Sequence, residues 1–305
     1  MNIAALHKTV TALPLIAMLA VSGCGGSGHT SMGIDPGGPA TPVDMEVPEQ
    51  DHVIQVAQQG SRAVSAIRDS GSNVVGLQVG NTTVTLDSHR LGQVSGTFQR
   101  PTVGSILQND DIRIRHIRSH WDMVTDVVST YEHLSFGAWA TVAPETGGNA
   151  EFDYRYEGIG DSYLAALDSA KTPVAGMPIA GMATYSGQYT GFVQGHGIDG
   201  DIANINGDVN IAADFANASL VVETLSVQGT AFSLSGSIQG STFSGTTIEQ
   251  MDANPFIQVT GATARMEGGF YGAGASEAGG VFEVIGGRSQ DPGRIVGAFG
   301  GKKAD

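Results

Sequence analysis

From residue 182 onward, segment after segment of the sequence alternates apolar and polar residues, and this pattern constrains the fold most. In 202–215, Ile205, Val209 and Ile211 fall on one side, whereas Asn204 and Asn210 fall on the other. Strict alternation is typical of an antiparallel sheet with one buried and one wet face. We predict eight strands, at 182–193, 202–215, 219–225, 230–239, 241–248, 262–271, 279–285 and 294–300. Their short connections favour a closed antiparallel barrel, because closure leaves no exposed sheet edge.

Glycine is unusually frequent in these predicted strands, as in GGFYGAGASEAGGVFEVI at 268–285. It weakens an ordinary strand, because it costs backbone entropy and offers no side chain to pack. A small barrel must bend its strands sharply, and glycine permits bends, bulges and close approach. We therefore predict that Phe270, Phe282 and Phe299 fill space left by Gly268, Gly269, Gly272, Gly279, Gly280, Gly297 and Gly300.

Composition extends the all-β prediction to the rest of the chain. Glycine accounts for 44 of 305 residues and charged residues for only 15%, which is typical of many short strands and tight turns. Upstream of a Pro/Gly-rich linker near Pro173, we predict strands at 73–79, 82–87, 111–117, 122–128, 132–140 and 151–156. Apolar residues between Asp51 and Asp69 recur three, four or seven apart, which predicts one short amphipathic helix there.

The first residues of the chain are predicted to be a targeting signal. Lys8 precedes an apolar run at 11–21 that is too short to span a bilayer, and VSGC follows it. This resembles a bacterial lipobox, in which the signal is cut before an acylated cysteine, and Cys24 is the only cysteine in the chain. An ordinary secretory signal with a chance cysteine is the alternative. Gly25, rather than aspartate, follows Cys24, which by the rule of that family predicts an outer-membrane destination.

We therefore expect a signal peptide at 1–23 and a lipidated Gly/Pro-rich tether at 24–50 with a reach of about 25–30 Å. The acyl chains would hold the protein on the membrane, and no later segment has the length and apolarity of a membrane helix. Cleavage before Cys24 removes one lysine and no acid, which leaves 14 basic and 30 acidic residues and a net charge of −16. That charge excludes nucleic acid as a partner.

A basic segment, RIRHIRSHW at 113–121, is the main candidate for partner binding in this acidic chain. Its candidate residues are Arg113, Arg115, Arg118, His116, His120 and Trp121. Arginine binds carboxylates bidentately, so the strip could receive an acidic protein patch or the propionates of haem. His116 or His120 could ligate haem iron. The alternative is a solvated face that nearby aspartates neutralise.

Neither a catalytic site nor a metal site is predicted. GDSYL at 160–164 is similar to a hydrolase block, but its surroundings do not resemble the start of an α/β domain. DGDIANINGD at 199–208 is rich in oxygen ligands, yet Ala203 and Asn210 stand where a calcium loop needs an oxygen ligand and a glutamate. Alternation explains these polar residues as the outer face of a strand.

Several of these segments resemble transferrin-binding protein B. MEGGFYGAGASEAGGVFEVI and RIVGAFGGKK are similar to the closing strands of its barrel, and PVAGMPIAGMATYSGQYTG to the opening strand. HLSFGAW at 133–139 resembles a segment of the handle domain that precedes the barrel. The chain departs from the family pattern at Ala273, where a proline is common. The resemblance implies a handle domain at 51–175 and an eight-stranded barrel at 176–305.

The resemblance also implies a function. It predicts a non-enzymatic, surface-exposed outer-membrane lipoprotein that binds a protein or small-molecule ligand in iron or other nutrient acquisition, and that a surface-lipoprotein translocator exports. The best-known members use two lobes to capture transferrin, whereas this chain has one. A carrier of haem or another small apolar ligand and an adhesion or envelope module are the alternatives. No cofactor is expected unless haem is the ligand.

Overall fold

The computed structural model describes residues 51–55, 62–68, 74–85, 105–108, 112–117, 131–144, 154–195, 202–226, 231–251, 260–286 and 292–304. These residues form β-strands, joined in places by the short 3-10 turns η2 (Asp168–Ala170) and η3 (Val174–Gly176). They all lie within one compact unit, Pro48–Asp305. The prediction of an all-β fold is confirmed.

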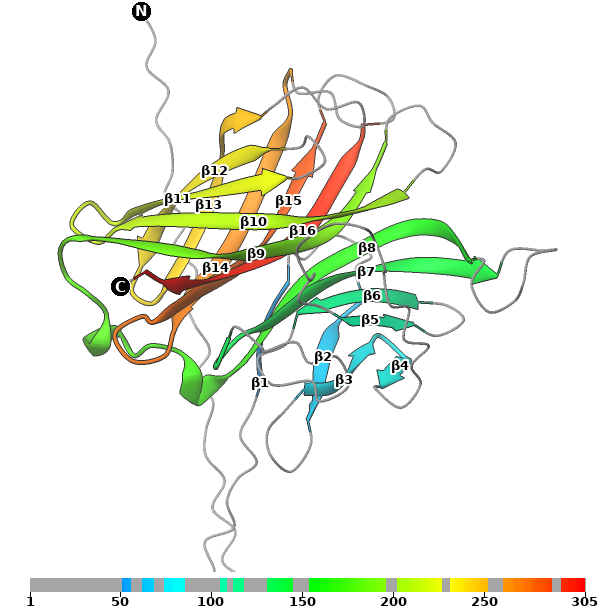
Figure 1. Ribbon diagram of the computed structural model, residues 1–305, viewed down its shortest axis with the longest axis horizontal. Helices are drawn as coiled ribbons and strands as arrows, with labels where there is room; N and C mark the ends of the chain where they lie inside the picture. The colour runs from blue at the N-terminus through cyan, green and yellow to red at the C-terminus, as the bar shows by residue number, and fades with distance from the viewer. Residues whose placement is uncertain are drawn as a thin grey trace, which may run out of the picture. The chain divides into compact units, whose positions relative to one another are not determined.

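The C-terminal part is a closed antiparallel barrel, in the order β10-β11-β12-β13-β14-β15-β16-β9 (Figure 1). Pairing of β16 with β9 closes it, from Arg294 opposite Gln194 to Lys303 opposite Tyr185. The eight predicted strands are confirmed, and several run a few residues further than expected. They are β9 (Met182–Gln194), β10 (Ile202–Asp214), β11 (Ser219–Ser226), β12 (Phe232–Gln239), β13 (Thr242–Met251), β14 (Thr263–Tyr271), β15 (Glu277–Ile285) and β16 (Arg294–Lys303).

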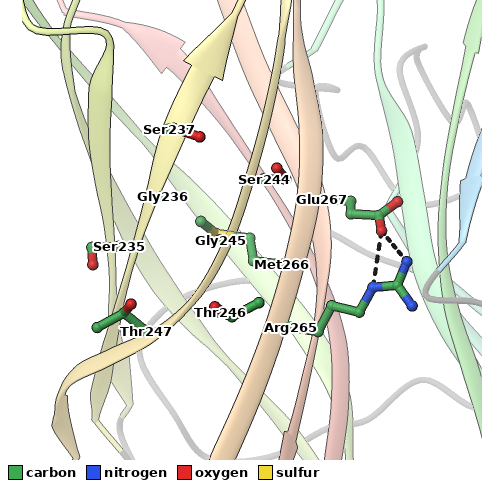
Figure 2. Close-up of a pocket in the computed structure, with 10 residues that line it drawn as sticks. All are labelled: Ser235, Gly236, Ser237, Ser244, Gly245, Thr246, Thr247, Arg265, Met266 and Glu267. Carbon is green, nitrogen blue, oxygen red and sulfur yellow. Dashed lines mark hydrogen bonds and ion pairs between the residues drawn. The ribbon is translucent and has the colours of Figure 1, made fainter. Parts of the chain in front are cut away.

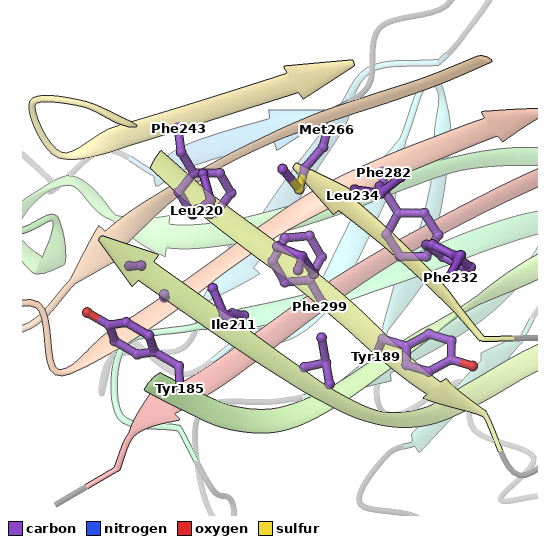
Figure 3. Close-up of a cluster of buried hydrophobic side chains, with 14 of the residues drawn as sticks. Tyr185, Tyr189, Ile211, Leu220, Phe232, Leu234, Phe243, Met266, Phe282 and Phe299 are labelled. Atoms are coloured by element: carbon purple, nitrogen blue, oxygen red, sulfur yellow. The ribbon is translucent and has the colours of Figure 1, made fainter. Parts of the chain in front are cut away.

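Side chains fill the barrel interior, and many of them are aromatic (Figure 3). The ring of Phe282 lies 5.1 Å from that of Phe232 and 6.3 Å from that of Phe299, measured between centroids. Phe243 packs edge-on against Phe270 at 5.5 Å. Edge-to-face contacts in this range are favourable for aromatic rings. The interior is therefore a packed hydrophobic core, as small barrels commonly have.

Three of the seven predicted glycines, Gly268, Gly280 and Gly297, make room for rings of the interior, whereas Gly279 and Gly300 face Leu134, Leu164 and Phe136 of the handle instead. A Cβ built on Gly280 would lie 2.9 Å from Cζ of Phe299. A Cβ on Gly297 would overlap the ring of Phe282, and one on Gly268 would overlap the ring of Phe243. Real Cβ atoms do not approach other atoms this closely, so each of these phenylalanines occupies space that the glycine paired with it on the neighbouring strand leaves open.

The described residues of the N-terminal region form two sheets. A five-stranded sheet has the order β1-β8-β7-β6-β5, and a three-stranded sheet has the order β2-β3-β4. The first sheet comprises β1 (Asp51–Gln55), β8 (Tyr154–Leu167), β7 (Ser135–Pro144), β6 (Ile112–Ile117) and β5 (Ser105–Gln108), and the second comprises β2 (Val64–Arg68), β3 (Val74–Val79) and β4 (Thr82–Thr85). Trp139 and Tyr163 of the large sheet pack with Val64, Leu77 and Val79 of the small one. We call this region the handle.

The predicted helix at Asp51–Asp69 is wrong, because both described segments in that range are strands. β1 pairs with β8, and β2 pairs with β3. The Gln55 side chain also accepts a hydrogen bond from the Val64 backbone N–H at 2.9 Å. The apolar residues of two separate short strands can together show the three- and four-residue spacing of a helix, because the residues between the strands offset one set from the other. The β-branched residues of DHVIQ and VSAIR suit strands.

The handle packs on the outer wall of the barrel. Leu134, Phe136 and Leu164 of the handle form one buried cluster with Val281 and Ala298 of the wall. A second cluster joins Ala138 and Ala140 of β7 with Phe192, Ile202 and Val296. The Tyr131 hydroxyl donates a hydrogen bond to the Gly300 carbonyl at 2.6 Å and accepts one from the Gln188 N–H at 3.1 Å. Apolar packing and directed hydrogen bonds together hold the handle on the wall.

Glycines on the outer wall create space for the handle, so that Gly279→Ala should destabilise the fold by about 1–3 kcal/mol, the usual cost of overpacking. The added Cβ would lie 2.8 Å from Cδ1 of Leu164, 2.9 Å from Cδ1 of Leu134 and 2.9 Å from the Phe299 carbonyl. Denaturant unfolding measures the change in the free energy of unfolding. Gly158→Ala is the matched control, because its Cβ meets only the Thr141 hydroxyl, at 3.3 Å. Equal effects at the two sites would contradict this account.

Candidate binding surfaces

The two ends of the barrel differ in the length of their connections. At one end β10–β11, β12–β13 and β14–β15 are joined by the tight turns 215–218, 240–241 and 272–276. At the other end, the connections 195–201, 227–231, 252–262 and 286–293 are generally longer. Loops on a rigid scaffold carry binding residues more often than the scaffold itself does. The end with longer connections, the long-loop end, is therefore one candidate for partner binding.

A second candidate is a hollow of about 560 Å³ in the barrel wall, where β12, β13 and β14 meet (Figure 2). Its lining is rich in hydroxyl groups, from Ser235, Ser237, Ser244, Thr246 and Thr247, and also includes Gly236, Gly245, Arg265, Met266 and Glu267. The Arg265 Nε donates a hydrogen bond to Oε1 of Glu267 at 2.9 Å. The hollow is therefore polar, with one ion pair on its rim.

Strand irregularities create this hollow. The register of β13 against β12 shifts twice, between Ser233 and Leu234 and between Ser235 and Ser237. Pairing of β13 with β14 runs only from Thr242 opposite Gly269 to Gly245 opposite Met266. Bulges bend a strand and increase its twist, which here separates β13 from β14 beyond Gly245. Such register shifts carry no simple sequence signature, and sequence analysis did not find this site.

The third candidate is a second hollow, of about 620 Å³, which lies in the handle and is lined by Arg62, Gly80, Asn81, Thr82, Thr141, Val142 and Glu157. The Arg62 guanidinium lies 5.8 Å above the Trp139 ring, within the range of a cation–π contact. The side chains offer hydrogen-bond donors and a carboxylate to a polar ligand. Sequence analysis missed Arg62, because it lies between two strands that were predicted as one helix.

Glu277 is a buried carboxyl group where the barrel meets the handle. It is 2% exposed, and its two oxygens accept hydrogen bonds from the backbone N–H groups of Glu132 at 2.7 Å and His133 at 3.1 Å. Burial raises the pKa of Glu277, and the hydrogen bonds and the charges of His133 and Lys302 oppose this shift only in part. Glu277 thus ties the residues just before the handle strand β7 to the barrel.

The raised pKa predicts how Glu277 affects stability at different pH values. The folded state binds the Glu277 proton more tightly than the unfolded state, so this contribution to stability is fully present below the unfolded pKa of about 4.5 and is lost as pH rises through the folded pKa. The stability of the wild type relative to Glu277→Gln should therefore increase as pH falls from 7 toward 4.5. Urea unfolding of both proteins across this range measures the difference, and a constant difference would contradict the prediction.

The structure places three of the six predicted binding residues. Arg113, Arg115 and His116 lie on β6, as expected for a strand, and pair with Ala140, Ala138 and Gly137 of β7. Arg118, His120, Trp121 and the lipidation residue Cys24 lie outside the described residues. The roles of all seven residues stay predictions.

The structure also shows where the hydrolase-like segment GDSYL and part of the acidic segment 199–208 lie. GDSYL lies within β8, and the acidic and amide residues of 202–208 lie on β10, as alternation predicted. In the part of the chain that the structure describes, no group of three or more His, Cys, Asp or Glu side chains is placed to hold a metal ion. Among the same residues, no helix is both long and apolar enough to cross a bilayer.

The fold is thus a closed eight-stranded barrel with a β-sheet handle packed on its wall. Residues 177–303 match the sequence profile of a family described as the C-lobe and N-lobe beta barrels of Tf-binding protein B. The match covers less than half of the chain and nearly the whole of the barrel domain. The barrel is therefore of the transferrin-binding protein B type, as the resemblance of its strands predicted. No curated protein matches the chain.

Solved structures of similar proteins include two transferrin-binding proteins B. A variant from Haemophilus parasuis is 14% identical in sequence. The alignment covers 83% of this chain and 44% of that one, with a TM-score of 0.47. The isotype 1 protein from Neisseria meningitidis is 19% identical, with coverages of 78% and 40% at a TM-score of 0.46. A structure described as a surface lipoprotein is 15% identical, with coverages of 84% and 100% at a TM-score of 0.41. The chain thus spans less than half the length of the two transferrin-binding proteins.

Proposed function

We propose that this protein is a lipid-anchored outer-membrane lipoprotein that faces the cell exterior and binds a partner protein in iron or other nutrient acquisition. The observation that carries the proposal is the match of 177–303 to the barrel family of transferrin-binding protein B. In this proposal, acylated Cys24 holds the chain on the membrane, a surface-lipoprotein translocator exports it, and it has no catalytic role.

The packing of the barrel supports a binding function on the outside of the molecule. The interior is occupied by large side chains such as Tyr189, Phe232 and Phe282, each no more than 2% exposed. A small ligand such as haem would have to displace this core, so we favour the outer surfaces. The long-loop end, the basic segment 113–121 and the two hollows offer loops, arginines and polar side chains, as protein-binding surfaces do.

Affinity capture tests the proposal. The mature chain, from Cys24 onward, is immobilised and exposed to host serum proteins and to the growth medium, with purified transferrin as a separate sample. We expect specific retention of one protein, and reduced retention when Arg113 and Arg115 are replaced by glutamine. A Soret absorption band in protein purified from haem-supplemented cells, with no protein retained, would instead favour a haem carrier. Normal growth of a deletion strain under iron limitation would exclude a role in iron acquisition.

A further inference from the structure

The tight-turn end of the barrel differs in charge from the rest of the protein. After Lys8 of the signal, the sequence contains only three lysines, Lys171, Lys302 and Lys303, in a chain with a net charge of −15. All three lie at this end. The backbone of Lys171 forms an isolated β-bridge with Tyr271 at the end of β14. Tyr271 lies opposite Glu277 of β15, and Glu277 lies opposite Lys302 of β16.

Acidic residues lie around these lysines, and they include Asp51, Glu132 and Glu277. Asp168 begins η2, which ends one residue before Lys171, and Asp214 ends β10. Asp214 already accepts hydrogen bonds from the Asn217 side chain at 2.7 Å and from the Asn217 backbone at 3.0 Å. The end therefore carries charges of both signs, and it holds every lysine of the chain after Lys8. These lysines are the groups at this end that would attract an anionic layer.

The same end exposes large apolar side chains. Ile179 is 92% exposed, Met182 78% and Val174 68%, which makes three of the five exposed large hydrophobic residues among those that the structure describes. They lie on the linker that enters the barrel and at the start of β9. The backbone N–H of Phe215 donates to the Gly181 carbonyl at 3.0 Å, which holds this linker against the β10–β11 turn. Ile179 and Met182 thus flank a fixed point of the linker.

The folded region begins close to these residues. Asp51, the first residue of β1, pairs with Leu167, and η2 follows directly at Asp168–Ala170. Only residues 25–50 separate Asp51 from the proposed lipid anchor at Cys24. A chain of this length, if unstructured, reaches about 25–30 Å on average. Such a short connection keeps this end at a high effective concentration relative to the bilayer.

We infer that the tight-turn end of the barrel docks on the bilayer, with Val174, Ile179 and Met182 at the level of the lipid headgroups and the lysines on anionic phosphates. The inference rests on the proposed lipid anchor. Exposed apolar side chains beside lysines are the usual composition of surfaces that bind at the membrane interface. The long-loop end, at the opposite ends of the same strands, would then point away from the membrane and be free to bind a partner.

Fluorescence quenching by lipid-borne nitroxides tests this orientation. The lipidated chain is reconstituted with a dye on an introduced thiol, at Ile179→Cys or, as the matched control, at Thr263→Cys, an exposed position at the long-loop end. Because Cys24 is acylated, each introduced cysteine is the only free thiol. In vesicles of phosphatidylethanolamine and phosphatidylglycerol, we expect several-fold stronger quenching at 179 than at 263.

The lysines are tested separately. Each lysine near an anionic surface raises partitioning about fivefold, so Lys171→Gln combined with Lys303→Gln should lower the ratio of docked to undocked protein more than tenfold. Lys302 is left unchanged because its charge acts on Glu277. The wild type should also show weaker quenching at 179 in pure phosphatidylcholine.

The outcomes separate this inference from the anchor on which it rests. If the chain floats with the vesicles but positions 179 and 263 are quenched equally, the anchor stands and the docking is wrong. If the chain does not float, the anchor is wrong and the docking falls with it. If a captured protein shields the dye at 179 in the absence of vesicles, this end binds a protein, which also overturns the inference.

Discussion

Phe282→Ala should lower the free energy of unfolding by about 3–5 kcal/mol, the usual cost of removing a buried phenylalanine ring. Phe282 is fully buried, and its ring contacts those of Phe232, Phe299 and Tyr189 at centroid distances of 5.1, 6.3 and 6.4 Å. The surrounding strands close on themselves and can collapse only partly into the cavity. Because a domain of ordinary stability has about 5–15 kcal/mol in total, the loss should be plain in urea unfolding followed by circular dichroism.

Leu225→Ala provides the control for Phe282→Ala, because Leu225 is 42% exposed on β11 and its truncation should cost less than about 1 kcal/mol. A second test uses Gly297, whose added Cβ would occupy the space of the Phe282 ring. Gly297→Ala should be strongly destabilising alone but much less so together with Phe282→Ala, since the two changes compete for one volume. Additive effects of the two substitutions would show that the ring does not lie over Gly297.

The barrel could be predicted because the alternation of residues within each strand shows which of its side chains are buried. On β10, Ile205, Val209 and Ile211 are buried, whereas Asp208 between them is exposed. The sequence of such a strand is therefore sufficient to predict which face lies inside the barrel. The glycine and phenylalanine pattern was equally informative, because only a tightly curved and densely packed wall accounts for both residue types together.

The handle was less predictable, because its strands depend on partners far away in the sequence. β1 pairs with β8, more than 100 residues later, and nothing within 51–55 indicates that partner. β8 extends from Tyr154 to Leu167, although only its first residues had been predicted as a strand. Its later part, residues 161–166, is buried without alternation, because Tyr163 packs against the three-stranded sheet and Leu164 packs against the barrel wall.

The contact between handle and barrel also explains an apparent exception to alternation. Every residue of β15 from Glu277 to Val284 is buried. Phe282 faces the interior, whereas Val281 packs outward with the handle cluster of Leu134, Phe136 and Leu164. A strand covered on both faces loses its two-residue period. The candidate sites were harder still, because the hollows arise from bulges and from two sheets meeting, which short sequence windows do not encode.

Cys24→Ser should abolish retention of the protein in the outer membrane, the largest functional effect that we expect of any single substitution. The proposed anchor consists of acyl chains, each buried methylene of which contributes about 0.8 kcal/mol, and several chains together bind stably where one does not. Docking by the tight-turn end alone could not replace them. Fractionation of cells that produce the variant should therefore move almost all of the protein out of the membrane fraction.

Gly25→Asp provides a matched control for the anchor, because it changes the residue after the cysteine and leaves the cysteine in place. By the sorting rule of bacterial lipoproteins, it should keep the protein lipidated and membrane-bound but retain it in the inner membrane. Radiolabelled palmitate should accordingly mark the wild type and Gly25→Asp but not Cys24→Ser. If Cys24→Ser remained in the outer membrane through a high-salt wash, the anchor would lie elsewhere in the chain. The tether could then no longer explain why the lysines and exposed apolar residues gather where the folded region begins.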